Sequence, residues 1–496
     1  MLPKPVSFTK GRIYMRPEIE KLLARADEWI SAHRQEFIEE IQTWARIPSV
    51  SRADLAEPGA PFGPECRRVL DTALERGRHY GFETVDHDGY AGSIYMGDYA
   101  DSLGVIGHLD VVPVGDGWIY PQFGATYLPE YDALVGRGVG DNKGPAVAGL
   151  FAMRMLRDFG WPLRHGLRLI CGLSEETGMQ DMVELGKRGV VFPKTSLVPD
   201  AGFPVNYGQK GSVDAEISAD CRGTLTAFDS GTVRNVIPDR AECVLALEAG
   251  TVAAALDGLD GELRARITSE PCEGGTRVVA HGKPGHAASP DGGINAIALL
   301  TRALDEAALL TGSCADAIRN LKELTADSYG ESEGVAFSDD ISGKLTLVYG
   351  VAHLKDGVLT VSVDCRSSIK IDQEWLLETL KADWARRGYS IVRISHTKPF
   401  YIPKDDARVV ALQQLYKDIT GRDDEPYTMG GGTYSRVVPN AISYGPGIPG
   451  DDNVKVFLPE GHGGAHGMDE VLYIDKVIAC MRIYVAALAM LDEIVD

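Results

Sequence analysis

The stretch LGVIGHLDVVP, residues 103–113, decides how the rest of the sequence is interpreted. It begins with an apolar run, as a buried strand does, and a histidine and an aspartate follow where that run ends. Side chains alternate along a strand, so His108 and Asp110 point to the same side. Polar side chains at the carboxyl end of a strand are where an α/β sheet builds its binding site. A buried histidine bonded to an aspartate, without a function, explains this stretch equally well on its own.

Two further apolar stretches also end in acidic residues. LRLICGLSEETG carries Glu175 and Glu176 at its end, and KTSLVPDAGFP carries Asp200. Helical patterns precede or separate these strands, over residues 16–47, over 64–80 and from Pro145 onward. Apolar strands interleaved with helices are typical of a mostly parallel sheet that is covered on both faces. The sequence therefore predicts an α/β fold with polar side chains collected at one edge of its sheet.

The pattern changes after Gly211. Alternating strands such as VDAEISADC and TRVVAHGK are followed by a helical pattern, and this order occurs twice before about Thr397. It predicts an inserted α+β domain with an antiparallel sheet, helices on one face and two similar lobes. We expect the first domain to occupy residues 1–211 and 398–496, and the inserted domain to occupy residues 212–397.

Composition limits the function further. The 496 residues carry a net charge of −21, and the acidic residues are spread along the chain, so we expect no nucleic acid and no membrane partner. The eight cysteines form no C-x-x-C pair and read as buried thiols in a reducing compartment. We see no signal peptide and no apolar run long enough to cross a bilayer, which favours a cytoplasmic protein.

The strand ends and two glycine-rich stretches together supply a mixed set of histidines and carboxylates. Zinc accepts such ligands, and manganese or cobalt are possible alternatives. Glu175 and Glu176 are adjacent, so one can bind metal while the other faces water as a general base. Any one of these residues alone is more simply a cap, a turn residue or a solvated side chain. The set comprises His108, Asp110, Asp141, Glu175, Glu176, Asp200, His462 and His466.

With these residues in place, the chain resembles the dinuclear metallopeptidase family that includes aminoacylase, glutamate carboxypeptidase, succinyl-diaminopimelate desuccinylase, carnosinase and bacterial dipeptidase V. The dipeptidase V branch is the most similar. The matching motifs follow one another in the family's order between residues 107 and 470. They are GHLDVVP, GRGVGDNKGP, SEETG, VPDAGFP, NVIPDRAE, GKPGHAASP, VDCRSS, GGTYSR and GAHGMDE.

The resemblance implies two divalent cations, with zinc as the first choice. It implies Glu175 as the general base and Asp110 as the residue that orients His108. His462 competes with His466 as a ligand, and we prefer His466 because the family has an acidic residue four positions later, here Glu470. The implied ligands are Asp141 as the bridge, His108 and Asp200 on one cation, and Glu176 and His466 on the other.

In the inserted domain, the resemblance implies a lid that contacts the substrate. His286 is similar to the family's lid histidine, which stabilises the oxyanion, and the family's spacing fits it better than His281. Asn235 and Arg366 resemble the residues that hold the substrate's carboxylate. The glycine loop beside the substrate is represented by Gly431, Gly432 and Thr433.

These features predict a dipeptidase that hydrolyses short peptides with a free C-terminal carboxylate. The inserted domain is nearly twice the length that one four-stranded lid needs. In the family that the chain resembles, short lids pair two subunits, whereas the doubled lid of dipeptidase V completes the site within one chain, so the resemblance implies a monomer, with a homodimer as the alternative. Deacylation of an N-acyl amino acid needs the same metals and the same carboxylate clamp, so it stays open. A non-catalytic protein that binds metal or peptide is the alternative from another class.

Overall fold

The computed structural model describes residues 16–450 and 457–496. They form two compact units. The first unit contains the described residues up to Tyr207, Ile402–Tyr427 and those from Thr433 onward, and the inserted unit contains Gly208–Tyr401 and Thr428–Gly432. The short segment Thr428–Gly432 was not expected to belong with the insertion. The division into a catalytic and a lid domain remains a prediction about function.

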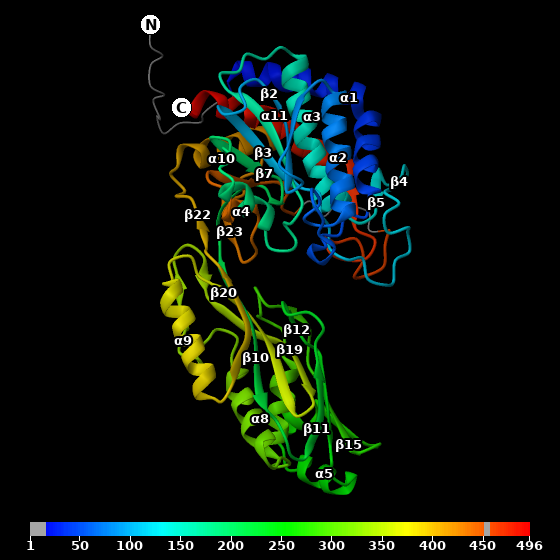
Figure 1. Cartoon of the computed structure of the whole chain (residues 1–496), viewed down its shortest axis with the longest axis vertical. Coiled ribbons are helices and arrows are strands. Elements are labelled where there is room, and N and C mark those ends of the chain that lie inside the picture. The colour runs from blue at the N-terminus through cyan, green and yellow to red at the C-terminus, as the bar shows by residue number, and fades with distance from the viewer. Residues whose placement is uncertain (1–15, 451–456) are drawn as a thin grey trace. The chain divides into compact units, whose positions relative to one another are not determined.

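The first unit is organised around a mixed sheet (Figure 1). Its four central strands are parallel, and antiparallel pairings extend the sheet on both sides. The predicted α/β class is therefore confirmed, with the parallel strands at its centre. The order is β1 (Glu83–Asp86), β2 (Ala91–Met96), β6 (Gly166–Gly172), β3 (Ser102–His108), β7 (Thr195–Val198), β24 (Ala441–Tyr444), β9 (Val205–Gln209) and β22 (Phe400–Tyr401), with β23 (Tyr427–Met429) beside β9.

Helices cover both faces of this sheet. Val105 of β3 packs against Gly149 of α3, whereas the next residue, Ile106, lies in a buried cluster with Met182 and Leu185 of α4. Prolines begin α1 and α2, as their fixed φ angle favours. The helices of this unit are α1 (Pro17–Ala45), α2 (Pro64–His79), α3 (Gly144–Asp158), α4 (Gln180–Lys187), α10 (Ala407–Thr420) and α11 (Ile474–Ile494).

Short strand pairs complete the first unit beside the sheet. β26 (Val471–Tyr473), β5 (Ala133–Val135) and β4 (Thr126–Leu128) form a small antiparallel sheet. β8 (Ala201–Gly202) pairs with β25 (Pro446–Gly447). These pairs connect segments that are far apart in the sequence, so they bring the late glycine-rich stretch near the ends of the central strands.

Gly107 allows strand β3 to lie very close to helix α3. A Cβ atom at this position would lie 2.8 Å from the Cβ of Ala146 and 2.9 Å from Oδ1 of Asn142. Only glycine leaves room for this approach, which sets the distance between the end of β3 and the turn that precedes α3.

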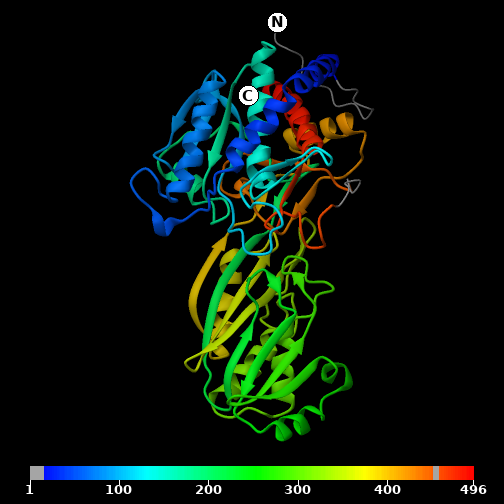
Figure 2. The same ribbon diagram turned by 90° about the vertical axis from the view of Figure 1, so that its right-hand side faces the viewer.

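The inserted unit contains one antiparallel sheet of eight strands (Figures 1 and 2). Alternate residues of its strands, such as Val213 and Ile217, are buried in one apolar core, whereas Asp214 and Glu216 point to the other face. The strand order is β14 (Ile267–Cys272), β15 (Gly275–His281), β13 (Arg240–Leu245), β11 (Leu225–Ser230), β19 (Thr346–Lys355), β20 (Val358–Ser367), β10 (Gly211–Asp220) and β21 (Ser390–Thr397).

Helices pack on the apolar face of this sheet, as predicted, and they contribute residues to the same core. Both α8 and the short α5 were missed in the sequence. The helices are α5 (Ala249–Leu256), α6 (Gly261–Arg264), α7 (Ala296–Glu306), α8 (Ser313–Leu324) and α9 (Gln373–Arg386). The remaining strand pairs are β12 (Val236–Ile237) with β16 (Gly285–His286), and β17 (Ser338–Asp339) with β18 (Gly343–Lys344).

The eight cysteines are all free thiols, and seven of them are buried. In the described part of the chain, no helix combines the length and the apolar character that crossing a membrane requires.

Candidate metal centre

The predicted site residues of the first unit converge at the carboxyl ends of its central strands. His108 ends β3, Glu175 and Glu176 follow β6, and Asp200 follows β7. Asp141 lies in the helical turn Val139–Lys143, directly before α3. Parallel strands end at the same edge of a sheet, so four segments separated in sequence deliver their side chains to one place.

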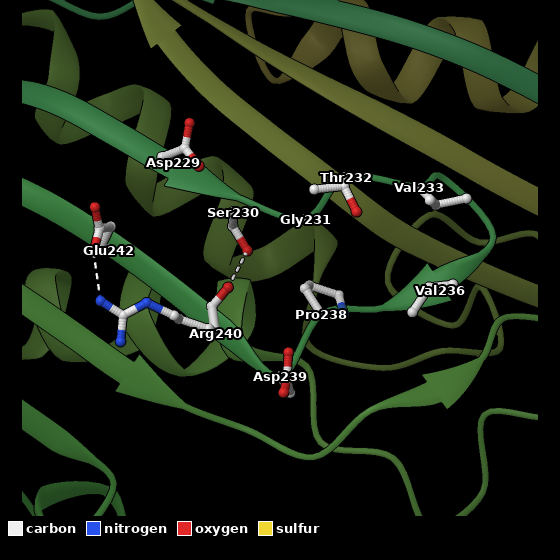
Figure 3. Close-up of a pocket in the computed structure, with 10 residues that line it drawn as sticks. All are labelled: Asp229, Ser230, Gly231, Thr232, Val233, Val236, Pro238, Asp239, Arg240 and Glu242. Atoms are coloured by element: carbon white, nitrogen blue, oxygen red, sulfur yellow. Dashed lines mark hydrogen bonds and ion pairs between the residues drawn. The ribbon is translucent and has the colours of Figure 1, made fainter. Parts of the chain in front are cut away.

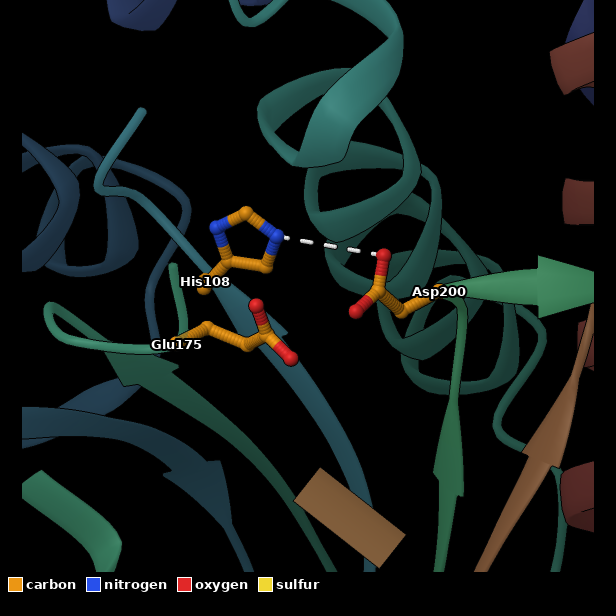
Figure 4. A group of neighbouring side chains, drawn as sticks. All are labelled: His108, Glu175 and Asp200. Atoms are coloured by element: carbon orange, nitrogen blue, oxygen red, sulfur yellow. Dashed lines mark ion pairs between the residues drawn. The ribbon is translucent and has the colours of Figure 1, made fainter. Parts of the chain in front are cut away.

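Two groups of candidate ligands overlap at His108. One contains His108, Glu175 and Asp200, and the other contains His108, Asp141 and Glu176, with the ligand atoms of each group within 4.8 Å of one another. Figure 4 shows the first group, in which Nε2 of His108 lies 3.8 Å from Oδ1 of Asp200.

Asp141 lies between two histidines. Its Oδ1 is 3.0 Å from Nε2 of His108, and its Oδ2 is 3.1 Å from Nε2 of His466. The same nitrogen of His466 lies 3.1 Å from Oε1 of Glu176. One oxygen of the Asp141 carboxylate thus faces His108, and the other faces His466, which also contacts Glu176. A carboxylate in this position can bridge two cations.

Asp110 contacts both glutamates as well as His108. Its carboxylate accepts hydrogen bonds from the backbone N–H groups of Glu175 and Glu176, both at 3.2 Å. Its backbone oxygen is 2.9 Å from Nδ1 of His108, whereas its Oδ1 is 3.5 Å from the same nitrogen. The ring of His108 is therefore oriented chiefly by the backbone of Asp110, and the carboxylate holds the Glu175–Glu176 turn.

Asn142 was missed in the sequence, although it joins three parts of the centre. Its Oδ1 accepts the backbone N–H of His108 at 3.3 Å. Its Nδ2 donates to the Pro199 oxygen at 2.5 Å and to Oδ1 of Asp200 at 3.3 Å. The side chain is buried and lies directly after Asp141. Its amide fixes the spacing between the ends of β3 and β7.

Glu470 holds the turn that carries Asp141. It accepts hydrogen bonds from the backbone N–H groups of Gly138, Gly140 and Asp141 at 2.9–3.1 Å. It also pairs with Arg137 at 2.8 Å, and both side chains are buried. Arg137 in turn donates to the backbone oxygen of His466 at 3.1 Å. One buried ion pair therefore connects the Asp141 turn with the His466 segment.

The centre carries an excess of carboxylates, and their pKa values respond to it. Burial, and after it the charge of Asp200, raises the pKa of Glu175 well above its usual value. Burial also raises the pKa of Glu176 and of Asp200. Hydrogen bonds to Asp141 and Glu176 raise the pKa of His466 to about 10. Closely spaced carboxylates in a buried place are the donor set that divalent cations stabilise, so the residues present fit a metal centre.

His462 and His281, which competed with His466 and His286 in the sequence analysis, have different surroundings. Nδ1 of His462 lies 2.6 Å from Oδ2 of Asp469, whose carboxylate also accepts the N–H groups of Ile119 and Tyr120. His281 is exposed and lies 3.4 Å from the hydroxyl of Thr268. In the structure, His466 faces Asp141 and Glu176, and His462 holds a neighbouring loop.

Two predicted substrate residues lie beside each other in the inserted unit. His286 pairs with Val236 across the β12–β16 ladder, and the backbone oxygen of Asn235 accepts the N–H of Ala287 at 2.9 Å. Nδ1 of His286 accepts the N–H of Ala288 at 3.1 Å, so the proton of the neutral ring is on Nε2. The ring is exposed and can donate from Nε2.

Arg366 and the glycine loop complete the predicted set. The guanidinium of Arg366 forms two hydrogen bonds of 2.7 Å with Asp364, and its Nη1 is 3.5 Å from the backbone oxygen of Gly430. Gly431 and Gly432 also belong to the inserted unit. Thr433 belongs to the first unit, where its hydroxyl bonds to Ser443 at 2.7 Å and accepts the N–H of Ser435.

Figure 3 shows a separate cavity of about 360 Å³ in the inserted unit. It is lined by the turn between β11 and β12, which leads to Asn235, and by the start of β13. None of the predicted site residues lines this cavity.

Residues 104–490 match the model of the peptidase family M20/M25/M40. The chain belongs to this family of peptidases. It is 30% identical to a protein of Bacillus subtilis (strain 168) described as "Putative dipeptidase YtjP", over 92% of this chain and 97% of that protein. A protein of Staphylococcus epidermidis with the description "Putative dipeptidase" is 29% identical over 84% of this chain and 91% of its own length.

Solved structures have the same fold. Human carnosine dipeptidase 1 matches with a TM-score of 0.55 at 17% identity, over 95% of this chain and all of that chain. The dipeptidase Dug1p from Saccharomyces cerevisiae matches with a TM-score of 0.55 at 14% identity, over 97% of this chain and 99% of its own. The mixed sheet with an inserted antiparallel domain is thus the fold of known M20 peptidases, and family membership makes this chain a peptidase and a hydrolase.

Proposed function

We propose that the chain is a metal-dependent dipeptidase, which hydrolyses the peptide bond of short peptides with a free C-terminal carboxylate. The observation that carries this proposal is the position of Asp141, whose two oxygens face His108 and His466 separately. Membership of a peptidase family and the dipeptidase descriptions of its relatives support it.

Two cations fit the donor set best. We assign Asp141 as the shared ligand, with His108 and Asp200 on one cation and Glu176 and His466 on the other. The mixture of imidazole and carboxylate favours zinc, and manganese or cobalt satisfy the same donors. When bound, the pair supplies charge that activates water and polarises the peptide carbonyl.

Glu175 is the base in this proposal. It is the glutamate beside a proposed ligand, and burial raises its pKa well above the usual value, which makes its carboxylate a stronger base toward water. It takes a proton from the attacking water and delivers it to the amine as the carbon–nitrogen bond breaks. Asp110 positions it through the backbone N–H of the Glu175–Glu176 turn.

Residues of the inserted unit supply substrate contacts in the proposal. His286 donates from Nε2 to the oxygen of the scissile carbonyl, which becomes negative during attack. Asn235 and Arg366 hold the C-terminal carboxylate, and the segment of Gly431, Gly432 and Thr433 lies along the peptide. The two bonds to Asp364 fix the plane of the Arg366 guanidinium, which leaves Nη1 as the donor for this contact.

The first experiment compares a free dipeptide with its N-acetylated and its C-terminally amidated forms. The metal-loaded protein should hydrolyse only the free dipeptide, because the amide lacks the carboxylate and the acetyl group removes the free amine. The Glu175→Ala variant should bind metal normally, as measured by calorimetry, and lose activity by at least about 100-fold.

The same experiment separates the alternative function. Preferred cleavage of the N-acetylated substrate would assign the chain to N-acyl-amino-acid hydrolysis with the same metal centre. Equal activity of the wild-type and Glu175→Ala proteins would remove Glu175 from its assigned role. An exposed glutamate of α1, changed in Glu28→Ala, is the matched control and should leave the activity unaltered.

We propose further that the protein acts as a monomer, since the inserted unit is long enough to supply both lobes of a lid. Light scattering on the metal-loaded protein tests this, and a dimeric mass contradicts it. The cysteines, which are mostly buried, support a reducing compartment such as the cytoplasm. The net charge of −21 supports a small peptide as the partner, in preference to nucleic acid or a membrane surface.

A further inference from the structure

Four consecutive backbone N–H groups lead into and form the Glu175–Glu176 turn, and two buried carboxylates accept them. Asp110 accepts the two N–H groups of the turn itself. Oδ2 of Asp181 accepts those of the two preceding residues, Leu173 at 2.6 Å and Ser174 at 3.0 Å. Successive N–H groups that point the same way favour a negative charge. Asp181 is therefore the counterpart of Asp110 on the other side of the turn, and the proposed function gives it no role.

Asp181 also receives a donor from a distant part of the chain. The hydroxyl of Tyr434 donates to the same Oδ2 oxygen at 2.5 Å, while Oδ1 accepts the N–H of Met182 at 2.7 Å. Asp181 and Tyr434 are completely buried. A Cβ atom at Gly172, the last residue of β6, would overlap the Tyr434 hydroxyl, so a glycine there allows the hydroxyl to reach Asp181. Short bonds from a hydroxyl to a buried carboxylate are strong and costly to lose.

Tyr434 directly follows the glycine loop, residues 431–433, which the proposed function assigns to the substrate. Thr433 is the first residue of this stretch that belongs to the first unit, and its hydroxyl bonds to Ser443 at 2.7 Å. One short segment thus carries the proposed substrate contacts and, one residue later, a hydrogen bond to the Asp181 carboxylate. The glycine loop and the Glu175–Glu176 turn therefore share one anchor.

We propose that Asp181 and Tyr434 are positioning residues for hydrolysis, and that their hydrogen bond keeps the carboxylate of Glu175 in its working position. The inference rests on the proposed function and adds two residues to it. A base must lie within hydrogen-bond reach of the proton that it removes, so a small shift of the turn lowers the rate even when substrate and metal stay bound. Asp110 supports the turn from the side of His108, and Asp181 supports it from the side of the glycine loop.

The Tyr434→Phe variant tests the proposal, because it removes one hydroxyl and keeps the ring in its contact with His108. In the metal-loaded protein, kcat for a free dipeptide should fall by about tenfold, since Glu175 loses part of its support. KM and the zinc affinity should stay within about twofold of the wild-type values, because Thr433 keeps its bond to Ser443. A fall in kcat alone distinguishes positioning from a loss of folded protein, which also lowers the amount of zinc bound per chain.

Tyr416→Phe is the matched control. Tyr416 is equally buried, and its hydroxyl donates to the carboxylate of Asp424 at 2.7 Å. It belongs to α10, which contributes no proposed site residue. The control variant should lose about as much stability in urea as Tyr434→Phe and should keep the wild-type kcat. Equal losses of kcat in the two variants would overturn the proposal, because the hydroxyl of Tyr434 would then matter for stability alone.

A double-variant comparison tests whether the two residues act through one contact. Asp181→Asn changes the acceptor of the hydrogen bond and should lower kcat at least as much as Tyr434→Phe. The variant with both changes should be within about twofold of Asp181→Asn, because the second change removes a contact that is already lost. Losses that multiply in the double variant would show that the residues act separately, which contradicts the proposal. If Asp181→Asn does not fold, the comparison of Tyr434→Phe with Tyr416→Phe still decides.

The outcomes separate this inference from the proposed function. Hydrolysis of the dipeptide at the same kcat by the wild-type and Tyr434→Phe proteins keeps the dipeptidase and overturns the role of Tyr434 and Asp181. Cleavage of the N-acetylated substrate alone overturns the dipeptidase, and the same comparison of kcat on that substrate then decides the inference. Full activity of Glu175→Ala removes the base and the inference with it. If neither substrate is cleaved, both proposals fall.

Discussion

Asp110 shows how one carboxylate organises the centre at the scale of single residues. Its two oxygens accept the backbone N–H groups of Glu175 and Glu176, while its backbone oxygen bonds to His108. A residue that touches the proposed base, a proposed ligand and the ring of another controls the spacing of all three. Residues of this kind typically change metal affinity by 10- to 100-fold when altered.

We expect Asp110→Asn to weaken metal binding by about 10- to 100-fold. An asparagine amide keeps one acceptor but places an NH₂ group where the second backbone N–H needs an oxygen, so the Glu175–Glu176 turn shifts. Calorimetric titration of zinc into the metal-free protein measures the change. Asp116→Asn, at an exposed position a few residues later, is the control. Unchanged zinc affinity in Asp110→Asn would show that the turn does not need both bonds.

At the scale of elements, the turn before α3 depends on a residue more than 300 positions away in the sequence. Glu470 receives three backbone N–H groups of that turn and the Arg137 guanidinium in a buried place. Removing one partner of a buried ion pair costs about 3–5 kcal/mol, because the other charge is left without compensation.

Glu470→Gln should therefore lower the free energy of unfolding by about 3 kcal/mol. It should also weaken metal binding, because the amide keeps only one of the two oxygens that accept from Arg137 and from the Asp141 turn, so this turn shifts. Denaturant unfolding of the metal-free protein and zinc titration measure the two effects. Glu460→Gln, an exposed change in the same late segment, should alter neither. A variant that is as stable as the wild type would mean that Arg137 finds another partner.

The strand ends were predictable from the sequence, because each is an apolar run followed by an acidic residue or a histidine. The contacts that hold them were not. Asn142 and Arg137 form their bonds across long sequence separations, and a single polar residue in a glycine-rich stretch carries no periodic signal. The sequence also did not predict that the edge strands pair antiparallel, because a hydrophobic pattern indicates which residues are buried but not whether neighbouring strands are parallel or antiparallel.

At the scale of the whole molecule, a buried glutamate makes stability depend on pH. Glu333 of the inserted unit accepts the hydroxyl of Tyr349 at 2.7 Å, and burial raises the pKa of Glu333 to about 8. The folded state therefore binds this proton more tightly than the unfolded state, whose value is near 4.5. The stabilisation from the protonated Glu333 is complete below about pH 4.5 and is lost as the pH rises to about 8.

We expect Glu333→Gln to remove this loss, which amounts to at most about 1.4 kcal/mol per pH unit in that window. The variant should be more stable than the wild type at pH 8, because it buries no charge. Unfolding midpoints in urea between pH 5 and pH 8 measure the effect, with a chelator in all samples. Glu331→Gln, in the same loop but exposed, should keep the wild-type slope.

The two predicted lobes of the inserted unit meet in one continuous sheet. β11 and β19 join its halves through the pairs of Asp229 with His353 and Ser230 with Ala352. On each side of this junction lie four strands, but β10, the first strand of the insertion in the sequence, lies in the half that also contains β19, β20 and β21. The sequence gives no sign of how two lobes combine, because pairing at their junction depends on only a few residues.

The segment Thr428–Gly432 affects how the protein could be divided for expression. It belongs with Gly208–Tyr401 although 26 residues of the first unit, Ile402–Tyr427, separate the two in the chain. A fragment cut at Gly208 and Tyr401 lacks this piece, so its recombinant form needs the five residues grafted on through a linker. Expression of the first unit alone requires removal of both Gly208–Tyr401 and Thr428–Gly432, and a linker must replace each of these segments. Fragment design for this enzyme therefore involves four cuts, because two separate segments make up the inserted unit, and excising one contiguous stretch leaves that unit without five of its residues.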